Sequence, residues 1–249
     1  MVSSIRCRYT PVQLPADRSG AADRWLSPAE RRALNRMRSP QRQATWLAGR
    51  MLAKKVLMKS LADTTDLIGI PSGAEIHIES TGAGHGQRPS VFVSGRPLDF
   101  ALSIAHTARG ILVAVATEAG VTLGVDLVCR HDLQTKRLAW CFTPAELRWL
   151  AAAPAEGRVP ERLWAMKEAL YKACQQGEGF APRRIEVVPG VDPRYPALDS
   201  ARSVRSLQSW RVDGQFAALA VAERRGAAGE VKHIGRNSAS ELNVPLLNS

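Results

Sequence analysis

The sequence predicts an α+β fold made of two similar halves, because two features of the first half return in the second. Ser27-Pro-Ala-Glu30 recurs as Thr143-Pro-Ala-Glu146, at an offset of 116 residues. Both motifs are typical of a helix start, with a hydroxyl N-cap, proline at the first helical position and glutamate closing a capping box. The helix after each motif also carries one spacing twice, at an offset of 118 residues, as Trp46, Arg50 and Lys54 and as Trp164, Glu168 and Lys172.

Repeats of this length indicate a duplicated α+β domain and not a solenoid of short units. Capping boxes are common, so chance recurrence is the alternative interpretation, but two features at nearly one offset favour duplication. The chain is accordingly divided into an N-terminal subdomain, 1–118, and a C-terminal subdomain, 119–225. Residues 226–249 are polar, small and aperiodic, which predicts a disordered tail.

Hydrophobic periodicity and turn residues predict the individual elements. Helices are expected to begin at Ser27 and Thr143 and to run over about 41–61 and 161–176, with Gly177 ending the last one. Loops are expected over 63–73 and 82–89. Strands, marked by alternation or short apolar runs, are expected at 4–9, 75–79, 100–104, 111–116, 121–128, 185–188, 206–212 and 216–222.

The bulk composition is that of an ordinary globular protein. The chain has 249 residues, of which 45% are hydrophobic and 23% charged, enough for a proper core without disulfides. The four cysteines are far apart and show no CxxC spacing, so neither a disulfide framework nor a zinc site is indicated. We expect a cytoplasmic protein with no membrane partner, because there is neither a signal-peptide pattern nor a run of about 20 apolar residues.

The net charge of +11 is the unusual bulk property. Such a surface attracts polyanions or acidic proteins. Nucleic acid is the default partner of a basic chain. The arginines are scattered, however, and the 6% of aromatic residues form no stacking platform, so a nucleic-acid partner is not expected.

The predicted helix over 161–176 presents two different faces. Leu163, Met166, Leu170 and Ala173 form an apolar face at spacings of three and four, whereas Trp164, Glu168 and Lys172 line up on another. A carboxylate at Glu168 flanked by Lys167 and Lys172 is suited to hold a metal ion beside an anionic substrate. The alternative interpretation is a solvated Glu/Lys surface.

A second candidate carboxylate lies in the predicted strand over 121–128. Asp126 stands within the apolar run Gly124-Val-Asp-Leu-Val128. An unpaired buried charge costs several kcal/mol. Asp126 therefore either caps a loop at the strand end or binds a metal, and together with Glu168 it offers two oxygen ligands to Mg²⁺.

His106 follows another predicted strand, with Thr107 after it and a turn at 108–110. A histidine there is structural, or donates to a phosphate in a cleft. No G-x-S-x-G motif accompanies it, which argues against a hydrolase triad. The glycine-rich loop over 82–86 is neither a P-loop nor a dinucleotide fingerprint, although Arg88-Pro89 after it is placed to contact a ligand.

Together these motifs resemble the 4′-phosphopantetheinyl transferases of the surfactin-synthetase type, over roughly 25–223. The resemblance rests on Arg-Pro at 88–89, Phe-Ala-Leu-Ser-Ile-Ala-His-Thr at 100–107, Gly-Val-Asp-Leu at 124–127, Phe-Thr-Pro-Ala-Glu at 142–146 and Trp-Ala-Met-Lys-Glu-Ala-Leu-Tyr-Lys at 164–172. It implies two pseudo-symmetric subdomains, each a small antiparallel sheet packed on a long helix, with the ligand cleft between them. The implied enzyme is monomeric and moves phosphopantetheine from coenzyme A onto a serine of an acidic apo acyl or peptidyl carrier protein.

The resemblance also implies roles for individual residues. Asp126 and Glu168 would hold Mg²⁺, with Mn²⁺ as the alternative ion, and Glu168 would accept the serine proton. Lys172 and His106 would act on the pyrophosphate or the leaving group. The residues implied to bind coenzyme A are Arg50, Arg88, His106, Thr107, Lys167 and Lys172.

Two positions depart from the family pattern. Val128 stands where many members carry a second carboxylate, and Ala105 stands where a serine often precedes the histidine. These departures keep a non-catalytic basic docking protein as the alternative function. Fatty-acid, polyketide and nonribosomal-peptide carriers all remain open as partners.

Overall fold

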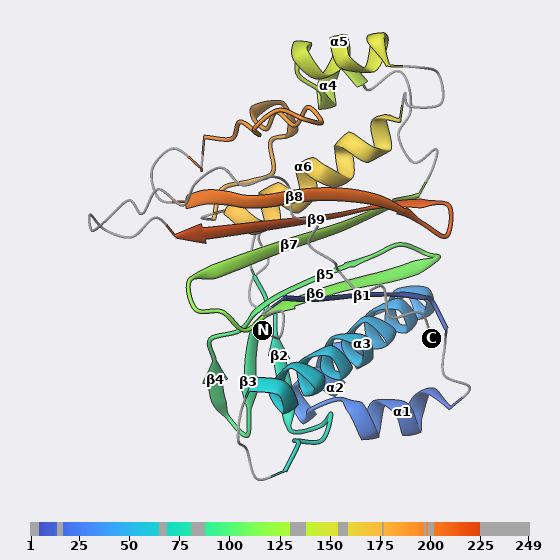
Figure 1. The fold of residues 1–249 in the computed structure, drawn as a ribbon. Coiled ribbons are helices and arrows are strands. Elements are labelled where there is room, and N and C mark those ends of the chain that lie inside the picture. The colour runs from blue at the N-terminus through green and yellow to red at the C-terminus, as the bar shows by residue number, and fades with distance from the viewer. Residues whose placement is uncertain are drawn as a thin grey trace.

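The structure is a computed structural model that describes residues 5–13, 17–64, 69–80, 88–129, 138–153, 159–175, 177–196, 198 and 202–224. Within these ranges it is an α+β fold of small antiparallel sheets and helices (Figure 1). The expected tail over 226–249 and most of the glycine-rich loop lie outside the described residues. No helix within the described ranges has the length and apolarity that crossing a membrane requires.

The first sheet packs on a long helix. Its strands are β1 (Ile5–Pro11), β6 (Gly110–Ala116) and β5 (Ala101–His106), in the order β1-β6-β5. Helix α3 (Pro40–Thr64) covers one face. Period-two alternation divides β6 between two cores: Ile111, Val113 and Val115 pack toward α3, whereas Leu112, Ala114 and Ala116 face the other way.

The second sheet packs on helix α6 (Pro160–Cys174). Its strands are β7 (Val121–Cys129), β9 (Gln215–Arg224) and β8 (Arg202–Val212), in the order β7-β9-β8. Phe216 and three alanines of β9 pack toward α6, and these small side chains let the helix lie close to the sheet. The intervening Ala217, Leu219 and Val221 point to the opposite face.

The two sheets pack on each other through these opposite faces. Apolar side chains of β5, β6, β7 and β9 form the shared core between them. The described chain is therefore layered as helix α3, first sheet, second sheet and helix α6 (Figure 1). Because β5 and β7 meet in the middle, residues at their ends come close to both helices.

Smaller elements complete the described fold. They are α1 (Arg18–Trp25), α2 (Pro28–Asn35), α4 (Leu138–Cys141), α5 (Pro144–Ala152), the 3₁₀ helix η3 (Pro182–Arg184), and a third sheet of β2 (Ile76–Glu79), β3 (Ser90–Val93) and β4 (Arg96–Leu98). Both predicted capping boxes are present: Ser27 with Glu30 begins α2, and Thr143 with Glu146 begins α5.

The element predictions need correction in several places. The helix expected over 161–176 ends at Cys174, with Gln175 and not Gly177 as its C-cap. The strand expected over 185–188 is only an isolated bridge between Glu186 and Arg194. Helix α1 was not expected, because it buries no side chain and so lacks apolar periodicity; its start depends on Asp17, which accepts from the amide of Gly20. The hairpin of β3 and β4 was also missed, since its strands are only four and three residues long.

Candidate active site

Strand β7 and helix α6 touch at Gly124. A Cβ atom built on this glycine would lie 1.9 Å from the carbonyl oxygen of Ala169 and 2.7 Å from the amide nitrogen of Ala173. No side chain fits in that space, so glycine lets the helix backbone rest on the strand. This close approach brings Asp126, two residues further along β7, beside the polar face of α6.

Two carboxylates and one ammonium meet at this contact. Lys172 Nζ lies 2.7 Å from Asp126 Oδ1 and 3.6 Å from Glu168 Oε2. It also donates to the carbonyl oxygen of Val125 at 3.1 Å. Asp126 is buried, while Glu168 and Lys172 each keep 28% of their side-chain surface exposed. The predicted pair of carboxylates is therefore close together, and Glu168 is the one that solvent reaches.

The surroundings of Glu168 raise the pKa of its carboxyl group to near neutral pH. Burial and the negative charge of Asp126 raise the pKa of Glu168 to about 7, against the opposing effects of Lys172 and of a hydrogen bond from Trp164. Burial tends to lower the pKa of Lys172, but the charges of Asp126 and Glu168 outweigh it and raise that pKa. Lys172 is thus a fixed positive charge.

A cavity of about 270 Å³ opens beside Lys172. It lies between the two halves, because α3 supplies one wall while β5, β7 and the end of α6 supply the others. The cationic side chains Arg50, Arg88 and Lys172 on its walls suit a ligand with anionic groups. The polar and aromatic residues that line it are Thr45, Trp46, Arg50, Ser80, Arg88, Ser103, His106, Lys172 and Gln175.

His106 stands at the exposed end of β5, on the wall of this cavity. Partial desolvation of the ring and the positive charges of Lys172 and Arg42 lower its pKa, and Asp126 opposes them only in part. A neutral imidazole can still donate one hydrogen bond to a phosphate. Ala105 faces the opposite way, into the apolar layer between the sheets, so its side chain does not line the cavity.

Arg50 is a buried cation with an unused donor. It is 5% exposed, donates from Nη2 to Ser80 Oγ at 2.7 Å, and stacks on the Trp46 ring at 4.8 Å. Its Nε lies 4.0 Å from Glu30 Oε1. Nη1 finds no hydrogen-bond partner within the described part of the chain. Burial lowers the pKa of Arg50, and Glu30 offsets this in part, so an anion at the cavity wall would be stabilised here.

Lys167, which was expected to contact coenzyme A, points into the protein interior. Its side chain is fully buried, and Nζ donates to Glu146 Oε2 at 2.6 Å, to the carbonyl oxygen of Pro182 at 2.8 Å and to that of Ile185. These three contacts use all three ammonium donors. These contacts leave no ammonium donor for coenzyme A, and Lys167 is not among the residues that line the cavity.

The same contacts correct the correspondence between the two halves. Lys54 is buried like Lys167 and donates to Glu30 of the first capping box at 2.5 Å, and to the carbonyl oxygens of Trp25 and Gly73. The sequence spacing aligned Lys54 with Lys172. By its contacts, however, Lys54 resembles Lys167. Spacing counts residues along a helix, whereas partners depend on which face turns toward the capping box.

Thr107 is also engaged elsewhere. Its Oγ1 donates to Gln215 Oε1 at 2.5 Å and accepts from the amides of Arg109 and Gly110 at 3.0 and 3.1 Å. It thereby closes the turn between β5 and β6 and is not among the residues that line the cavity. The contacts of Thr107 are those of a residue that stabilises a turn.

Several cavity residues carried no recognisable signal in the sequence. Ser80, Ser103 and Gln175 are isolated polar residues, and tertiary packing alone brings them together. Gly49 did carry a signal, since glycine inside a helix costs about 1 kcal/mol relative to alanine and so has a packing or functional reason. It lines the cavity opposite Ile104.

The region around the carboxylate cluster matches a known family. Residues 122–221 match the family model of the 4′-phosphopantetheinyl transferase superfamily. This match supports a transferase activity of that kind and extends from β7 to β9, so it contains Asp126, Glu168 and Lys172. Residues 1–121, including Arg50 and His106, lie outside it. No curated protein matches the chain.

Proposed function

We propose that the protein transfers the 4′-phosphopantetheine arm of coenzyme A to a serine of an apo acyl or peptidyl carrier protein, releasing adenosine 3′,5′-bisphosphate. The observation that carries this proposal is the cluster of Asp126, Glu168 and Lys172. It lies inside the region that matches the transferase superfamily and beside a cavity lined by both halves of the chain.

Coenzyme A is proposed to occupy that cavity, between the subdomains 1–118 and 119–225. Arg50, with its unused Nη1 donor, and the ammonium of Lys172 provide positive charge on different walls. His106 provides a further donor at the exposed end of β5. Binding the remote adenosine would position the reacting phosphorus, which is the main source of catalysis in phosphoryl transfer.

The carboxylates fit a hard divalent cation. Mg²⁺ is commonly held by one or two carboxylates together with waters and substrate phosphates. Asp126 and Glu168 are such a pair, and a cation would offset both the burial and the charge of Asp126 that raise the pKa of Glu168. Among the described residues no group of three acidic, histidine or cysteine side chains gathers, so these two would be the protein ligands. Mg²⁺, or Mn²⁺ in its place, would neutralise charge on the pyrophosphate.

The proposed reaction is one displacement at phosphorus. The serine Oγ forms a bond to the phosphorus that carries pantetheine, and the bond from that phosphorus to the bridging oxygen breaks. The bonding electrons leave on adenosine 3′,5′-bisphosphate. Glu168 accepts the serine proton, a role suited to a carboxylate whose pKa is near the working pH. Lys172 and His106 face the phosphates and stabilise charge on the leaving group.

The charge of +11 supports an acidic protein partner. A positively charged enzyme and an acidic carrier protein attract each other over distance and associate faster. We propose a monomeric, cytoplasmic enzyme that acts on such carriers, with neither nucleic acid nor membrane as a partner.

Intact-mass measurement tests this function directly. The protein is incubated with coenzyme A, Mg²⁺ and apo carrier proteins from fatty-acid, polyketide and nonribosomal-peptide synthesis. A carrier that gains the mass of the phosphopantetheine arm supports the transferase. A stable complex without mass gain would support the alternative, a basic docking protein, which Val128 keeps open because it leaves the site with two carboxylates.

A further inference from the structure

The C-terminal end of α6 is held by an arginine from the other half of the chain. Arg88 donates from Nε to the carbonyl oxygen of Lys172 at 3.3 Å, and from Nη2 to those of Ala173 at 2.6 Å and Gln175 at 3.0 Å. The last carbonyls of a helix lack partners within the helix. A guanidinium there also complements the negative end of the helix dipole.

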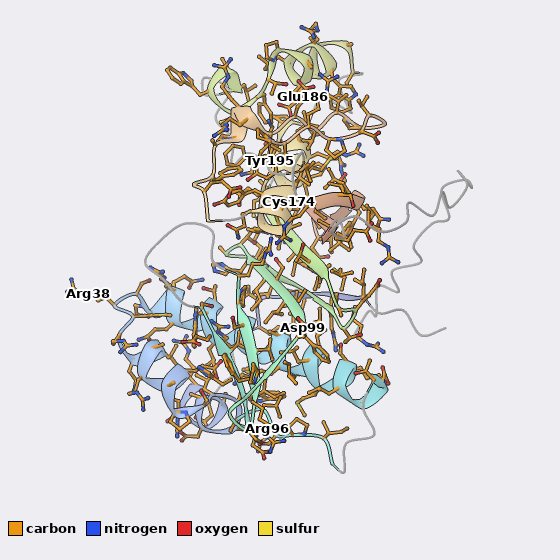
Figure 2. All side chains as sticks on the ribbon, turned by 90° about the vertical axis from the view of Figure 1, so that its left-hand side faces the viewer. Arg38, Arg96, Asp99, Cys174, Glu186 and Tyr195 are labelled. Atoms are coloured by element: carbon orange, nitrogen blue, oxygen red, sulfur yellow. The ribbon has the colours of Figure 1, made fainter. Side chains whose placement is uncertain are left out.

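This contact crosses the boundary between the halves at the cavity. Arg88 and Pro89 line the cavity together with Lys172 and Gln175. The contact between Arg88 and the end of α6 therefore lies on the cavity wall. Figure 2 shows Cys174, the last residue of α6, on the side of the second half that faces the first. Nearby contacts to the helix end come from the second half, where Thr122 Oγ1 donates to the carbonyl oxygen of Ala173 at 2.7 Å.

The held segment includes a residue of the reactive cluster. Arg88 binds the backbone of Lys172, whose ammonium reaches Asp126 and Val125. Gly124 lets α6 rest directly on β7, so the position of the helix end sets how Lys172 lies against Asp126. Holding the helix end therefore holds Lys172, and one turn earlier Glu168, in register with Asp126.

We infer that Arg88 is a positioning residue, which fixes the end of α6 to the first half and thereby aligns Lys172 and Glu168 for transfer. This inference rests on the proposed function. It differs from the role that the family resemblance implies for Arg88, a direct contact with coenzyme A. Nε and Nη2 both donate to carbonyl oxygens at the end of α6, so these two nitrogens hold the helix end.

The two roles predict different effects of substitution. A residue that binds coenzyme A contributes to affinity, so its loss raises the dissociation constant. A positioning residue contributes to the alignment of reacting groups, so its loss lowers kcat, and small misplacements cost up to about 100-fold. The test therefore measures affinity and turnover separately, in Arg88→Gln and in Arg88→Lys, which keeps the charge but not the planar fork.

Arg96→Gln is the matched control. It removes the same charge from an exposed arginine of β4, in the same half, and Figure 2 shows Arg96 at the end of that half far from Cys174. Affinity is measured by calorimetry with adenosine 3′,5′-bisphosphate, and turnover by mass gain of the carrier protein. Thermal unfolding of each variant shows that the folded protein is being compared.

We expect Arg88→Gln to lower kcat by about 10- to 100-fold, with the dissociation constant within about threefold of wild type. Arg88→Lys should recover part of the turnover, and Arg96→Gln should match wild type in both measurements. An increase of tenfold or more in the dissociation constant with unchanged kcat would overturn the inference and restore the direct contact.

Hydrogen exchange keeps this test separate from the proposed function. If the wild-type protein transferred nothing to any carrier, the proposed function would fail, but the contact between Arg88 and the end of α6 could still be measured. Amides over 171–175 should exchange faster in Arg88→Gln than in Arg96→Gln and wild type. Equal exchange in all three would overturn the inference even if transfer were intact.

Discussion

Two lysines on α6, five residues apart, have opposite environments. Lys167 is fully buried, and its three donors are used by Glu146 and two carbonyl oxygens. Lys172 is partly exposed, lies between two carboxylates and lines a cavity. We call Glu146 and Lys167 the closed pair, because protein atoms use every donor of the ammonium. We call Asp126, Glu168 and Lys172 the open cluster, because it adjoins a cavity and contains a carboxylate whose pKa is raised to about 7.

The two lysines of α6 are therefore proposed to have different roles, Lys167 in stability and Lys172 in function. A similar pair, Glu30–Lys54, lies in the first half, with a capping box and backbone carbonyl oxygens as further partners in both places. Such saturated pairs fix how a helix, a capping box and a loop fit together. The Asp126–Glu168–Lys172 cluster holds like charges close together, which costs stability and is typical of functional sites.

The largest expected effect is on turnover at the open cluster. Glu168→Gln removes the proposed proton acceptor and one carboxylate, so we expect transfer to fall by at least about 1,000-fold. Asp126→Asn should cause a comparable loss. Mass gain of the carrier measures both, and circular dichroism shows whether the fold persists. Retention of wild-type turnover by either variant would contradict the proposed roles.

The closed pair should respond in stability and not in function. Lys167→Met leaves Glu146 buried without its cation, so we expect the free energy of unfolding to fall by about 3 to 5 kcal/mol. Urea unfolding measures this change. In the fraction that stays folded, affinity for adenosine 3′,5′-bisphosphate should match wild type, and a large loss of that affinity would restore Lys167 as a ligand contact.

Gly124→Ala should affect stability and function together. The added methyl group would lie 1.9 Å from the carbonyl oxygen of Ala169, so α6 must move away from β7. We expect a loss of about 2 to 4 kcal/mol in the free energy of unfolding, together with a lower kcat because Asp126 and Lys172 separate. Gly95→Ala is a control glycine in an open turn, where strain comes from its positive φ alone. An unchanged kcat in folded Gly124→Ala would show that this contact does not align the cluster.

The pH dependence of stability distinguishes the open cluster from the closed pair. The pKa of Glu168 is about 7 in the folded protein, against an ordinary value of 4.5. Between these values the folded state binds more protons than the unfolded state, so this contribution is full below pH 4.5 and is lost as pH rises through 7. Glu168→Gln has no proton to lose. We expect its unfolding free energy relative to wild type to increase by about 1 to 3 kcal/mol from pH 4.5 to pH 8, without divalent ions. A constant difference across this range would contradict the raised pKa.

The smallest expected effect concerns metal affinity. Val128 lies two residues after Asp126 on the face of β7 that packs toward α6, and it is buried. Val128→Glu adds a carboxylate on that face, which should strengthen binding of Mg²⁺ several-fold and lower stability without it. Thermal unfolding across a Mg²⁺ titration, with Val128→Gln as the uncharged control, measures both effects. An unaltered titration would show that position 128 lies away from the ion.

The sequence predicted the parts of the fold that local physics controls. Both capping boxes, the long helices and the strands around β6 and β7 follow from cap residues and from apolar spacing. Helix α1 was missed, and the strand predicted over 185–188 was wrong, since neither segment shows a strong periodic pattern. For the candidate site, the grouping of Asp126, Glu168 and Lys172 came from residue type, spacing and family resemblance.

The sequence by itself thus determined which residues are able to carry charge and which helix faces are apolar. Only the tertiary structure decided which lysine is closed off and which is open, because this depends on the rotation of α6 against β7 and the capping box. Ser80, Ser103 and Gln175 joined the cavity for the same reason. A side chain's partners depend on distances across the fold, whereas spacing along the chain fixes only its neighbours within one element.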